Sequence, residues 1–177
     1  FLQDRPLTGR EKGSATHLFM QFVRYEACTT REGIRQELAR LQAEKFLTPR
    51  QCEAVDTEKI LALFSSGLGT RILGAKNLRR EFKFSILTDA AAYDPAAAGE
   101  QIMLQGVVDC FWQEADGIVI LDFKTDYIDG DLDRKTARYA PQLRAYAKAL
   151  SRIYGLPVKK TILYFFSAGR AAEIDPE

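Results

Sequence analysis

The sequence predicts a single α/β domain, residues 1–177, in which a mixed central sheet flanked by helices follows a helical N-terminal half. Three observations predict this class. Apolar residues recur at helical spacing over about residues 9–75, and from Leu78 onward they alternate with polar residues as in half-buried strands. A last helical pattern lies between two strand patterns, so we expect the final strand to run parallel to an earlier one. The sheet core is expected over about residues 77–167.

Composition places the chain among ordinary globular proteins and excludes several classes of function. Hydrophobic residues make up 46% of the chain, and 25 Lys and Arg balance 24 Asp and Glu, so any attraction to nucleic acid must be local. Cys28, Cys52 and Cys110 form no C-x-x-C pair, which argues against a zinc ribbon, an iron–sulfur cluster or a disulfide framework and fits a reducing compartment. No apolar run is long enough to span a membrane, and there is no signal-peptide pattern. Because the chain lacks an initiating Met, we expect a fragment of a larger protein.

Each helix expected in the first half has its own start signal. The first runs from Gly9 to about Ala27, with apolar residues along one face. Thr29-x-x-Glu32 predicts a capping box that opens a second helix, and Thr48-Pro49-Arg50-Gln51 repeats the device with Pro at the first helical position. Asp56 is expected to cap a further helix, which the stretch SSGLG ends.

The second half contains the expected strands. Turn residues and alternation divide it into short elements, and Pro141 near the start of the one helix and Gly155 after its end mark that helix's limits. The expected elements are a strand over Leu78–Leu87, a loop over 88–100, strands over Gln101–Trp112 and Gly117–Phe123 joined by a turn at Gln113–Asp116, a helix over Ala140–Tyr154 and a last strand over Val158–Ser167.

Asp109, Asp122 and Lys124 interrupt the two central strands. If these strands pair as a hairpin, the two carboxylates come near one another, and anions in such a place repel unless a cation lies between them. Carboxylate oxygens suit Mg²⁺ or Mn²⁺, and Lys124, two residues after Asp122, points to the same side of its strand. The alternative is that all three residues are solvent-facing positions of a half-buried sheet.

Further positions are candidates for the same site. His17, the one histidine, lies on the helix face opposite the apolar stripe, where a neutral imidazole is available as a metal ligand, although a surface histidine without a role fits the same pattern. Gln142 and Tyr146 share one face of the helix that follows the second acidic strand, or Tyr146 packs at the edge of the core. Glu81 either adds a carboxylate or is solvated.

Taken in order, these motifs resemble the RecB-type nuclease family of the PD-(D/E)XK superfamily. The resemblance rests on the histidine within GSATHLFMQFV, the strand glutamate, the G-x-x-D of Gly106–Asp109, the D-x-K of Asp122–Lys124 and the Q-x-x-x-Y of Gln142–Tyr146. It covers nearly the whole chain, including YAPQLRAYAKAL and the final ILYFFSAGRAAEI. Because the three cysteines are not placed to hold an iron–sulfur cluster, the chain resembles the AddA-like or RecB-like branch rather than the AddB type.

The resemblance implies a restriction-endonuclease-like fold and a role for each matching residue. It implies that His17, Asp109 and Asp122 ligate a divalent metal, Mg²⁺ or Mn²⁺, with the backbone carbonyl of Phe123 as a further ligand. Lys124 matches the catalytic lysine that orients or activates the attacking water. The Q-x-x-x-Y residues match the motif that positions DNA and supports the site, and the strand glutamate is matched by Glu81.

The resemblance also implies an activity and a setting. The family hydrolyses DNA phosphodiesters with a divalent metal. In the AddA-like branch, this implies exonuclease action on single-stranded ends during double-strand-break processing and recombinational repair. It further implies the bacterial cytoplasm, no membrane, and a partner subunit of the AddB type. ATP-driven unwinding is expected outside this chain, because GLGTRILG lacks the lysine of a phosphate-binding loop.

Two other functions stay open on the sequence alone. A non-catalytic DNA-guiding or interaction module on a decayed nuclease fold predicts lost ligands, whereas every motif position here is filled. A metal-dependent phosphatase of small esters predicts turnover of nucleotides but not of polymers. The basic residues that could meet DNA phosphates are Arg79, Arg80, Arg134 and Lys135, although a solvated surface is the simpler explanation for all four.

Overall fold

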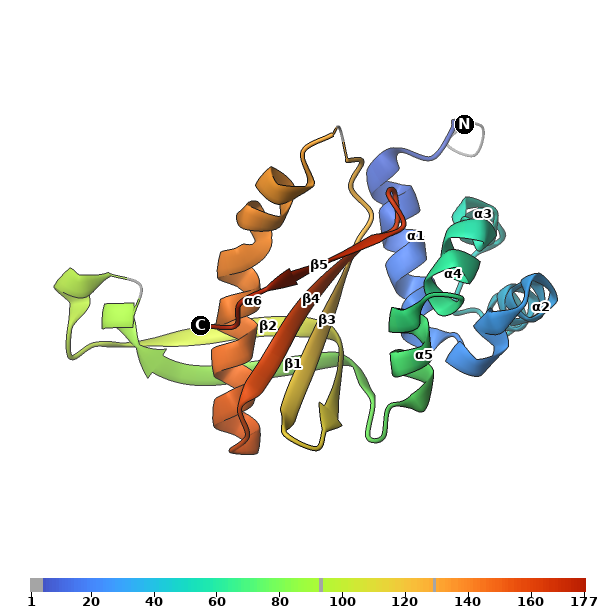
Figure 1. Cartoon of the computed structure of the whole chain (residues 1–177). Helices are drawn as coiled ribbons and strands as arrows, with labels where there is room; N and C mark the ends of the chain where they lie inside the picture. The colour runs from blue at the N-terminus through green and yellow to red at the C-terminus, as the bar shows by residue number, and fades with distance from the viewer. Residues whose placement is uncertain (1–4, 93, 129) are drawn as a thin grey trace.

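The computed structural model describes residues 5–92, 94–128 and 130–177, which form a five-stranded mixed sheet with helices on both faces (Figure 1). The helices are α1 (Gly9–Phe22), α2 (Arg31–Ala43), α3 (Pro49–Ala54), α4 (Thr57–Phe64), α5 (Gly67–Gly74) and α6 (Leu132–Tyr154). The strands are β1 (Arg79–Asp89), β2 (Gln101–Glu114), β3 (Gly117–Lys124), β4 (Val158–Phe165) and β5 (Arg170–Ile174). Short 3-10 turns are η1 (Tyr25–Thr29), η2 (Ala90–Ala92) and η3 (Pro95–Ala97).

The sheet has the order β1-β2-β3-β4-β5, and its one parallel pair is β3 with β4. Helix α6 makes the crossover between these two strands, which confirms the parallel last strand expected from the sequence. The hairpin of β2 and β3 is confirmed as well, with its turn shortened to Ala115–Asp116. One strand was not expected. β5 adds to the edge beside β4, so the sheet extends beyond residue 167, because pairing orders a segment whose short RAAEI sequence carries little strand propensity.

Two hydrophobic cores lie on the two faces of the sheet. One packs α1, α2, α4 and α5 against it, and the other packs α6 against the opposite face. β3 supplies both cores in alternation, with Val119, Leu121 and Phe123 in the first core and Ile118 and Ile120 in the second. A strand covered on both faces reads as a continuous apolar run. Solvent exposure is therefore the wrong explanation for a charge within β3.

The start signals of the helical half are partly confirmed. Both hydrogen bonds of the Thr48–Gln51 capping box form, and the Asp56 carboxylate accepts from the N–H groups of the next turn. The first helix ends earlier than expected, at Phe22, because Val23 takes an extended conformation. The second helix is capped by Thr30 rather than Thr29, since the Thr30 hydroxyl accepts from the Gly33 N–H.

Two helix limits differ from expectation for local reasons. The SSGLG stretch ends α4 and also starts α5, because the Ser66 hydroxyl accepts from the Gly69 N–H. α6 begins at Leu132 instead of Ala140, because Asp131 caps a polar first turn that carries no apolar stripe. Pro141 consequently lies inside the helix rather than at its start.

The alternation of side chains between the two faces of the sheet is interrupted in β1 at Glu81 and in β2 at Asp109. Arg80 pairs with Cys110, and both point toward the N-terminal helices, whereas Phe82 pairs with Val108 and both belong to the α6 side. Residues two apart in a regular strand share a face, so the pleat must reverse between these pairs. Glu81 makes the change with a left-handed backbone, φ 50°. Beyond this point the two strands leave the sheet as an arm (Figure 1).

Candidate active site

The two expected carboxylates lie where the sheet meets α1 on one side and α6 on the other. Asp122 on β3 is only 3% exposed. Asp109 on β2 reaches across the hairpin, and its Oδ2 accepts a hydrogen bond of 2.8 Å from the Phe123 N–H. His17 on α1 approaches the same oxygen, with Nδ1 at 3.5 Å. The structure thus brings His17, from a distant helix, to Asp109 of the hairpin, and the charge on Asp122 of the same hairpin acts on both groups.

The electrostatics of this cluster favour an added cation. Burial raises the pKa of Asp109, the charge on Asp122 raises it further, and the hydrogen bond from Phe123 opposes the change. Burial lowers the pKa of His17, although the charge on Asp122 acts in the opposite direction. A histidine whose pKa is lowered in this way presents a neutral imidazole, the form that binds metals.

Lys124 begins a chain of contacts that runs from β3 to α6. Its Nζ lies 2.7 Å from Asp122 Oδ2 and donates to Gln142 Oε1 at 3.2 Å. Gln142 Nε2 in turn donates to the Tyr146 hydroxyl at 2.7 Å. The Q-x-x-x-Y spacing therefore serves to place an amide against the lysine, with a tyrosine one turn later to hold that amide.

Sequence reasoning missed Tyr139, whose ring covers the lysine. The Tyr139 ring faces Lys124, with Nζ 4.1 Å from the ring centroid. The Tyr139 hydroxyl donates to the Asp126 carboxylate, and the Asp126 carbonyl accepts from Ser167 Oγ at 2.5 Å. A signal was available for Tyr139, because it precedes Gln142 by three residues and so shares its helix face.

Glu81 belongs to the same cluster. The pairs on either side of it leave Glu81 opposite Asp109, and its left-handed backbone marks the twist of the two strands. Burial raises the pKa of Glu81, Lys83 lowers it, and the charge on Asp122 raises it. Glu81 is half-buried and lines the cleft beside the cluster, and its part in the site stays a prediction.

Two glycines allow the helices to approach. A Cβ on Gly106 would lie 2.7 Å from Tyr146 Cε1 and 2.8 Å from the Phe84 ring, so the first residue of the G-x-x-D motif makes room for the tyrosine. A Cβ on Gly13 would lie 2.5 Å from Thr125 Oγ1, one residue after Lys124. Gly106 thus seats α6 against β2, and Gly13 seats α1 against the segment that follows β3.

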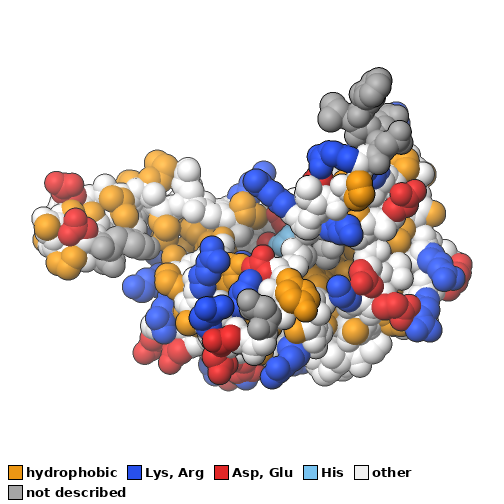
Figure 2. Space-filling view, turned by 90° about the horizontal axis from the view of Figure 1, so that it is seen from above, with side chains coloured by type: hydrophobic (Ala, Val, Ile, Leu, Met, Phe, Trp, Pro, Cys, Tyr) orange, Lys and Arg blue, Asp and Glu red, His pale blue; other side chains and the backbone are white. Residues whose placement is uncertain are grey.

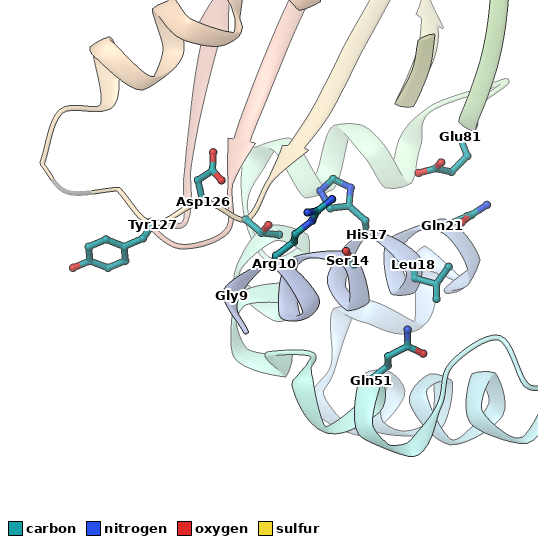
Figure 3. Close-up of a pocket in the computed structure, with 12 residues that line it drawn as sticks. Gly9, Arg10, Ser14, His17, Leu18, Gln21, Gln51, Glu81, Asp126 and Tyr127 are labelled. Atoms are coloured by element: carbon teal, nitrogen blue, oxygen red, sulfur yellow. The ribbon is translucent and has the colours of Figure 1, made fainter. Parts of the chain in front are cut away.

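A cleft of about 790 Å³ opens beside the cluster, between α1 and the segment that follows β3 (Figure 3). His17 and Glu81 line it, together with Arg10, Ser14, Gln51 and Tyr127. Figure 2 shows the imidazole of His17, the one histidine of the chain, within this hollow and with Lys and Arg side chains nearby. His17 therefore both lines the cleft and lies 3.5 Å from Asp109.

The basic residues singled out in the sequence are not grouped at this cleft. Arg80 is structural, because it donates to the carbonyls of Met20 and Val23, at 3.2 and 2.6 Å, and lies over the Tyr25 ring. Arg134 is 3.8 Å from Asp131 at the start of α6. Neither arginine is among the residues that line the cleft.

The residues of the cluster fit a divalent cation, although no three His, Cys, Asp or Glu side chains among the described residues converge into a complete metal cage. Asp122 Oδ2 is buried without a hydrogen-bond donor, since the ammonium beside it forms an ion pair that is not aligned as a hydrogen bond. A hard cation needs only a few carboxylates and takes its other ligands from water and phosphate. Asp109 and Asp122 would supply that donor set, and ligation by these two carboxylates, by His17 and by the Phe123 carbonyl stays a prediction.

Comparison with known families identifies the fold. The profile described as the PD-(D/E)XK nuclease superfamily matches residues 2–176. The chain belongs to this superfamily. Its mixed sheet flanked by helices is accordingly a PD-(D/E)XK nuclease fold, as the resemblance in the motifs implied.

Curated relatives place this PD-(D/E)XK nuclease chain in the AddA-like branch. It is 37% identical over 178 residues to the A-type subunit of the ATP-dependent helicase/nuclease of Clostridium novyi strain NT, covering 97% of this chain and 14% of that protein. It is 39% identical over 186 residues to the protein of the same name from Bacillus mycoides strain KBAB4, covering 99% and 15%. The chain therefore spans about a seventh of the length of these relatives. A solved structure described as the crystal structure of SSO0001 matches with a TM-score of 0.43 and 20% identity, over 90% of this chain and 64% of that one.

Proposed function

We propose that this nuclease domain is a Mg²⁺-dependent exonuclease that hydrolyses phosphodiester bonds of single-stranded DNA. One observation carries the proposal: Lys124 Nζ lies 2.7 Å from Asp122 Oδ2, beside Asp109 and at the edge of a cleft. An ammonium held next to two buried carboxylates provides positive charge for a phosphate and oxygen ligands for a cation in one place.

The residues divide the chemistry between them. Asp109 and Asp122 would hold Mg²⁺, with Mn²⁺ as a substitute, and the ion when bound polarises the phosphate and lowers the pKa of the attacking water. Lys124 offsets the negative charge that grows on the phosphate oxygens as the water oxygen adds to phosphorus and the bond to the leaving oxygen breaks. Gln142 and Tyr139 keep the ammonium in place. The attacking water gives one proton to solvent, and the leaving oxygen takes one from solvent.

The name of the relatives supports a place in a larger helicase–nuclease. We propose that the parent protein feeds a single strand, the one with the 3′ end, to this domain during double-strand-break processing and recombinational repair. An AddB-type subunit would be its partner, and the bacterial cytoplasm its compartment. Within the described ranges, no helix is both long and apolar enough to cross a membrane.

The proposal is tested with end-labelled single-stranded oligonucleotides. We expect cleavage in Mg²⁺ or Mn²⁺ that proceeds from an end, stops in a chelator, and falls roughly 10²- to 10⁴-fold in Lys124→Ala. Lys148→Ala is the matched control, because Lys148 is an exposed lysine of α6 outside the cleft. Cleavage that survives the chelator, or that Lys124→Ala leaves undiminished, contradicts the catalytic assignment.

The absence of a complete three-residue metal cage among the described side chains favours a second candidate, a non-catalytic DNA-guiding module. That module would bind single strands with either ion and cleave neither polymers nor nucleotides. Turnover of free nucleotides without cleavage of polymers would instead indicate a phosphatase.

A further inference from the structure

The cleft beside the carboxylates continues away from them along α1. A second hollow shares Arg10, Ser14 and Gln51 with the cleft and adds Leu7 and Arg50. A third hollow shares Leu7 and Arg50 with the second. The three are therefore contiguous, and we call them the α1 groove.

Arginines and neutral polar groups line the groove, beside the four acidic residues Glu11, Glu53, Glu81 and Asp126. Arg10 is exposed, and no ion pair or hydrogen bond to another described residue engages its side chain. In Figure 3 it extends from the start of α1 into the cleft, in the direction of His17. Arg50 lines the second hollow together with Arg10, Ser14 and Gln51. Such groups bind phosphate and sugar oxygens without regard to sequence.

The exposed ring of Tyr127 lies at the rim of the groove, at the end that contains His17. Tyr127 follows β3 by three residues and is 78% exposed. Figure 3 shows its side chain projecting outward from the rim rather than packing into the cleft. A ring that contributes so little to either core is free to receive another flat surface. The base of a nucleic acid offers such a surface only when it is unpaired and unstacked.

We propose that the α1 groove is the path of the single strand, with Arg10 and Arg50 on successive phosphates and Tyr127 stacked on the base at the rim. The proposal rests on the proposed function in one respect: the bound strand is the substrate of the nuclease site. It adds that this domain itself selects unpaired DNA, because the ring has nothing to stack on in a closed duplex. Selection for single strands then does not depend on a helicase alone.

Binding measured without cleavage tests the groove. Fluorescence anisotropy of a labelled single strand in a chelator gives the dissociation constant of the whole chain. We expect Tyr127→Ala to weaken binding roughly 5- to 100-fold, and Tyr127→Phe to bind almost as tightly as the unsubstituted protein. Arg10→Gln should weaken binding and reduce the slope of log affinity against log salt by about 0.7. Arg35→Gln, an exposed arginine on α2, is the control and should leave both unchanged.

A series of strands that each lack one base tests whether Tyr127 stacks on a base. Removal of one base at a time along the strand should weaken binding to the unsubstituted protein at one position. Removal of the base at that position should not change the affinity of the Tyr127→Ala variant. The groove is overturned if Tyr127→Ala binds single strands normally, or if it loses as much affinity for a blunt duplex.

Cleavage of single strands in Mg²⁺ tests the proposed function separately. If the groove variants weaken binding but the unsubstituted protein cleaves nothing, the proposed nuclease activity is wrong and the proposed strand path stands. If the protein cleaves single strands and the groove variants bind normally, the strand path is wrong and the nuclease activity stands.

Discussion

The two helices that border the site, α1 and α6, contact it in different ways. The α6 wall is formed by Tyr139, Gln142 and Tyr146. Lys124 Nζ lies 4.1 Å from the Tyr139 ring centroid and donates to Gln142 at 3.2 Å, and Gln142 in turn donates to Tyr146 at 2.7 Å. The α1 wall, formed by Arg10, Ser14 and His17, faces an open cleft and meets the carboxylates through His17 at 3.5 Å from Asp109. The difference teaches that one wall holds the catalytic charge in place while the other leaves room for the substrate.

Each wall also depends on one glycine. Gly106 admits the Tyr146 ring to the surface of β2, and Gly13 admits Thr125 to the surface of α1. Substitutions can therefore act on one wall at a time, and their effects on turnover and on binding should separate.

The largest effect is expected between the walls, at Asp109. Asn at this position can still accept from the Phe123 N–H, but it removes a charge that burial and Asp122 disfavour. We expect Asp109→Asn to lower cleavage about 10³-fold, the loss that corresponds to several kcal/mol of metal-assisted stabilisation. The free energy of unfolding should rise by about 0.5–2 kcal/mol. Oligonucleotide cleavage and chemical denaturation measure the two quantities.

The control for Asp109 is Asp116→Asn, an exposed aspartate in the turn between β2 and β3. It should change neither cleavage nor stability appreciably. A loss of stability in Asp109→Asn would show that this carboxylate is not held against electrostatic repulsion.

The next effect distinguishes the walls through kinetics. Gln142→Ala removes the amide that holds Lys124, so kcat should fall roughly 10- to 100-fold while KM stays nearly constant. Arg10→Gln should do the opposite and raise KM at nearly constant kcat. Steady-state cleavage of a single strand measures both, with Gln36→Ala on the exposed face of α2 as control. Equal effects of the two variants on kcat would remove the distinction between the walls.

A smaller effect is expected at the two glycines. Gly106→Ala forces a methyl group against two buried rings, which should cost about 1–3 kcal/mol of stability. Gly13→Ala should cost less, because the Thr125 side chain can turn aside and Ala favours the helix by about 0.5–1 kcal/mol. Thermal unfolding measures both.

A double variant sharpens the test of the α1 wall. Thr125→Ala removes Oγ1 and leaves Cβ, at 3.4 Å from the Cβ on residue 13, as the nearest atom. It should therefore restore stability to Gly13→Ala. Gly74→Ala, where no atom lies within 4 Å, is the control. Gly106→Ala with unchanged stability would contradict the close approach of Tyr146.

The last effect concerns the support of the α1 wall, and it depends on pH. Glu37 is buried on α2 and accepts from Arg40, which also donates to the Phe22 carbonyl at the end of α1. The hydrogen bond from Arg40 lowers the pKa of Glu37 below 4.5, against the opposing effect of burial. The ionised form is therefore favoured by folding, and its contribution is present above the pKa of the unfolded chain and lost as the pH falls through the folded value.

We expect Glu37→Gln to lower the free energy of unfolding by about 1–3 kcal/mol at neutral pH. The difference from the unsubstituted protein should shrink as the pH falls below about 4. Glu44→Gln, which removes the exposed partner of Arg40, should have little effect. A difference that does not change with pH would show that the charge of Glu37 contributes nothing. Denaturant titrations across this pH range measure it.

Much of the fold could be predicted because its signals are local. The Thr48 and Asp56 caps and the β2–β3 hairpin each follow from a few neighbouring residues. The misses have the same origin. The first turns of α6 carry no apolar stripe, and β5 is too short and polar to be recognised without the edge of β4 beside it.

The site follows the same division. The sequence by itself determined which polar residues interrupt apolar strands and which share a helix face, because periods of 2 and 3.6 residues are properties of the backbone. Asp122 with Lys124, and Gln142 with Tyr146, follow from those periods. Only the tertiary structure decided that Asp122 is buried rather than solvated, that a twist at Glu81 turns its carboxylate toward the site, and that His17 reaches Asp109. These placements depend on how two separate cores position α1 and α6 against one sheet. A short-range sequence pattern does not predict contacts between segments so far apart in the chain.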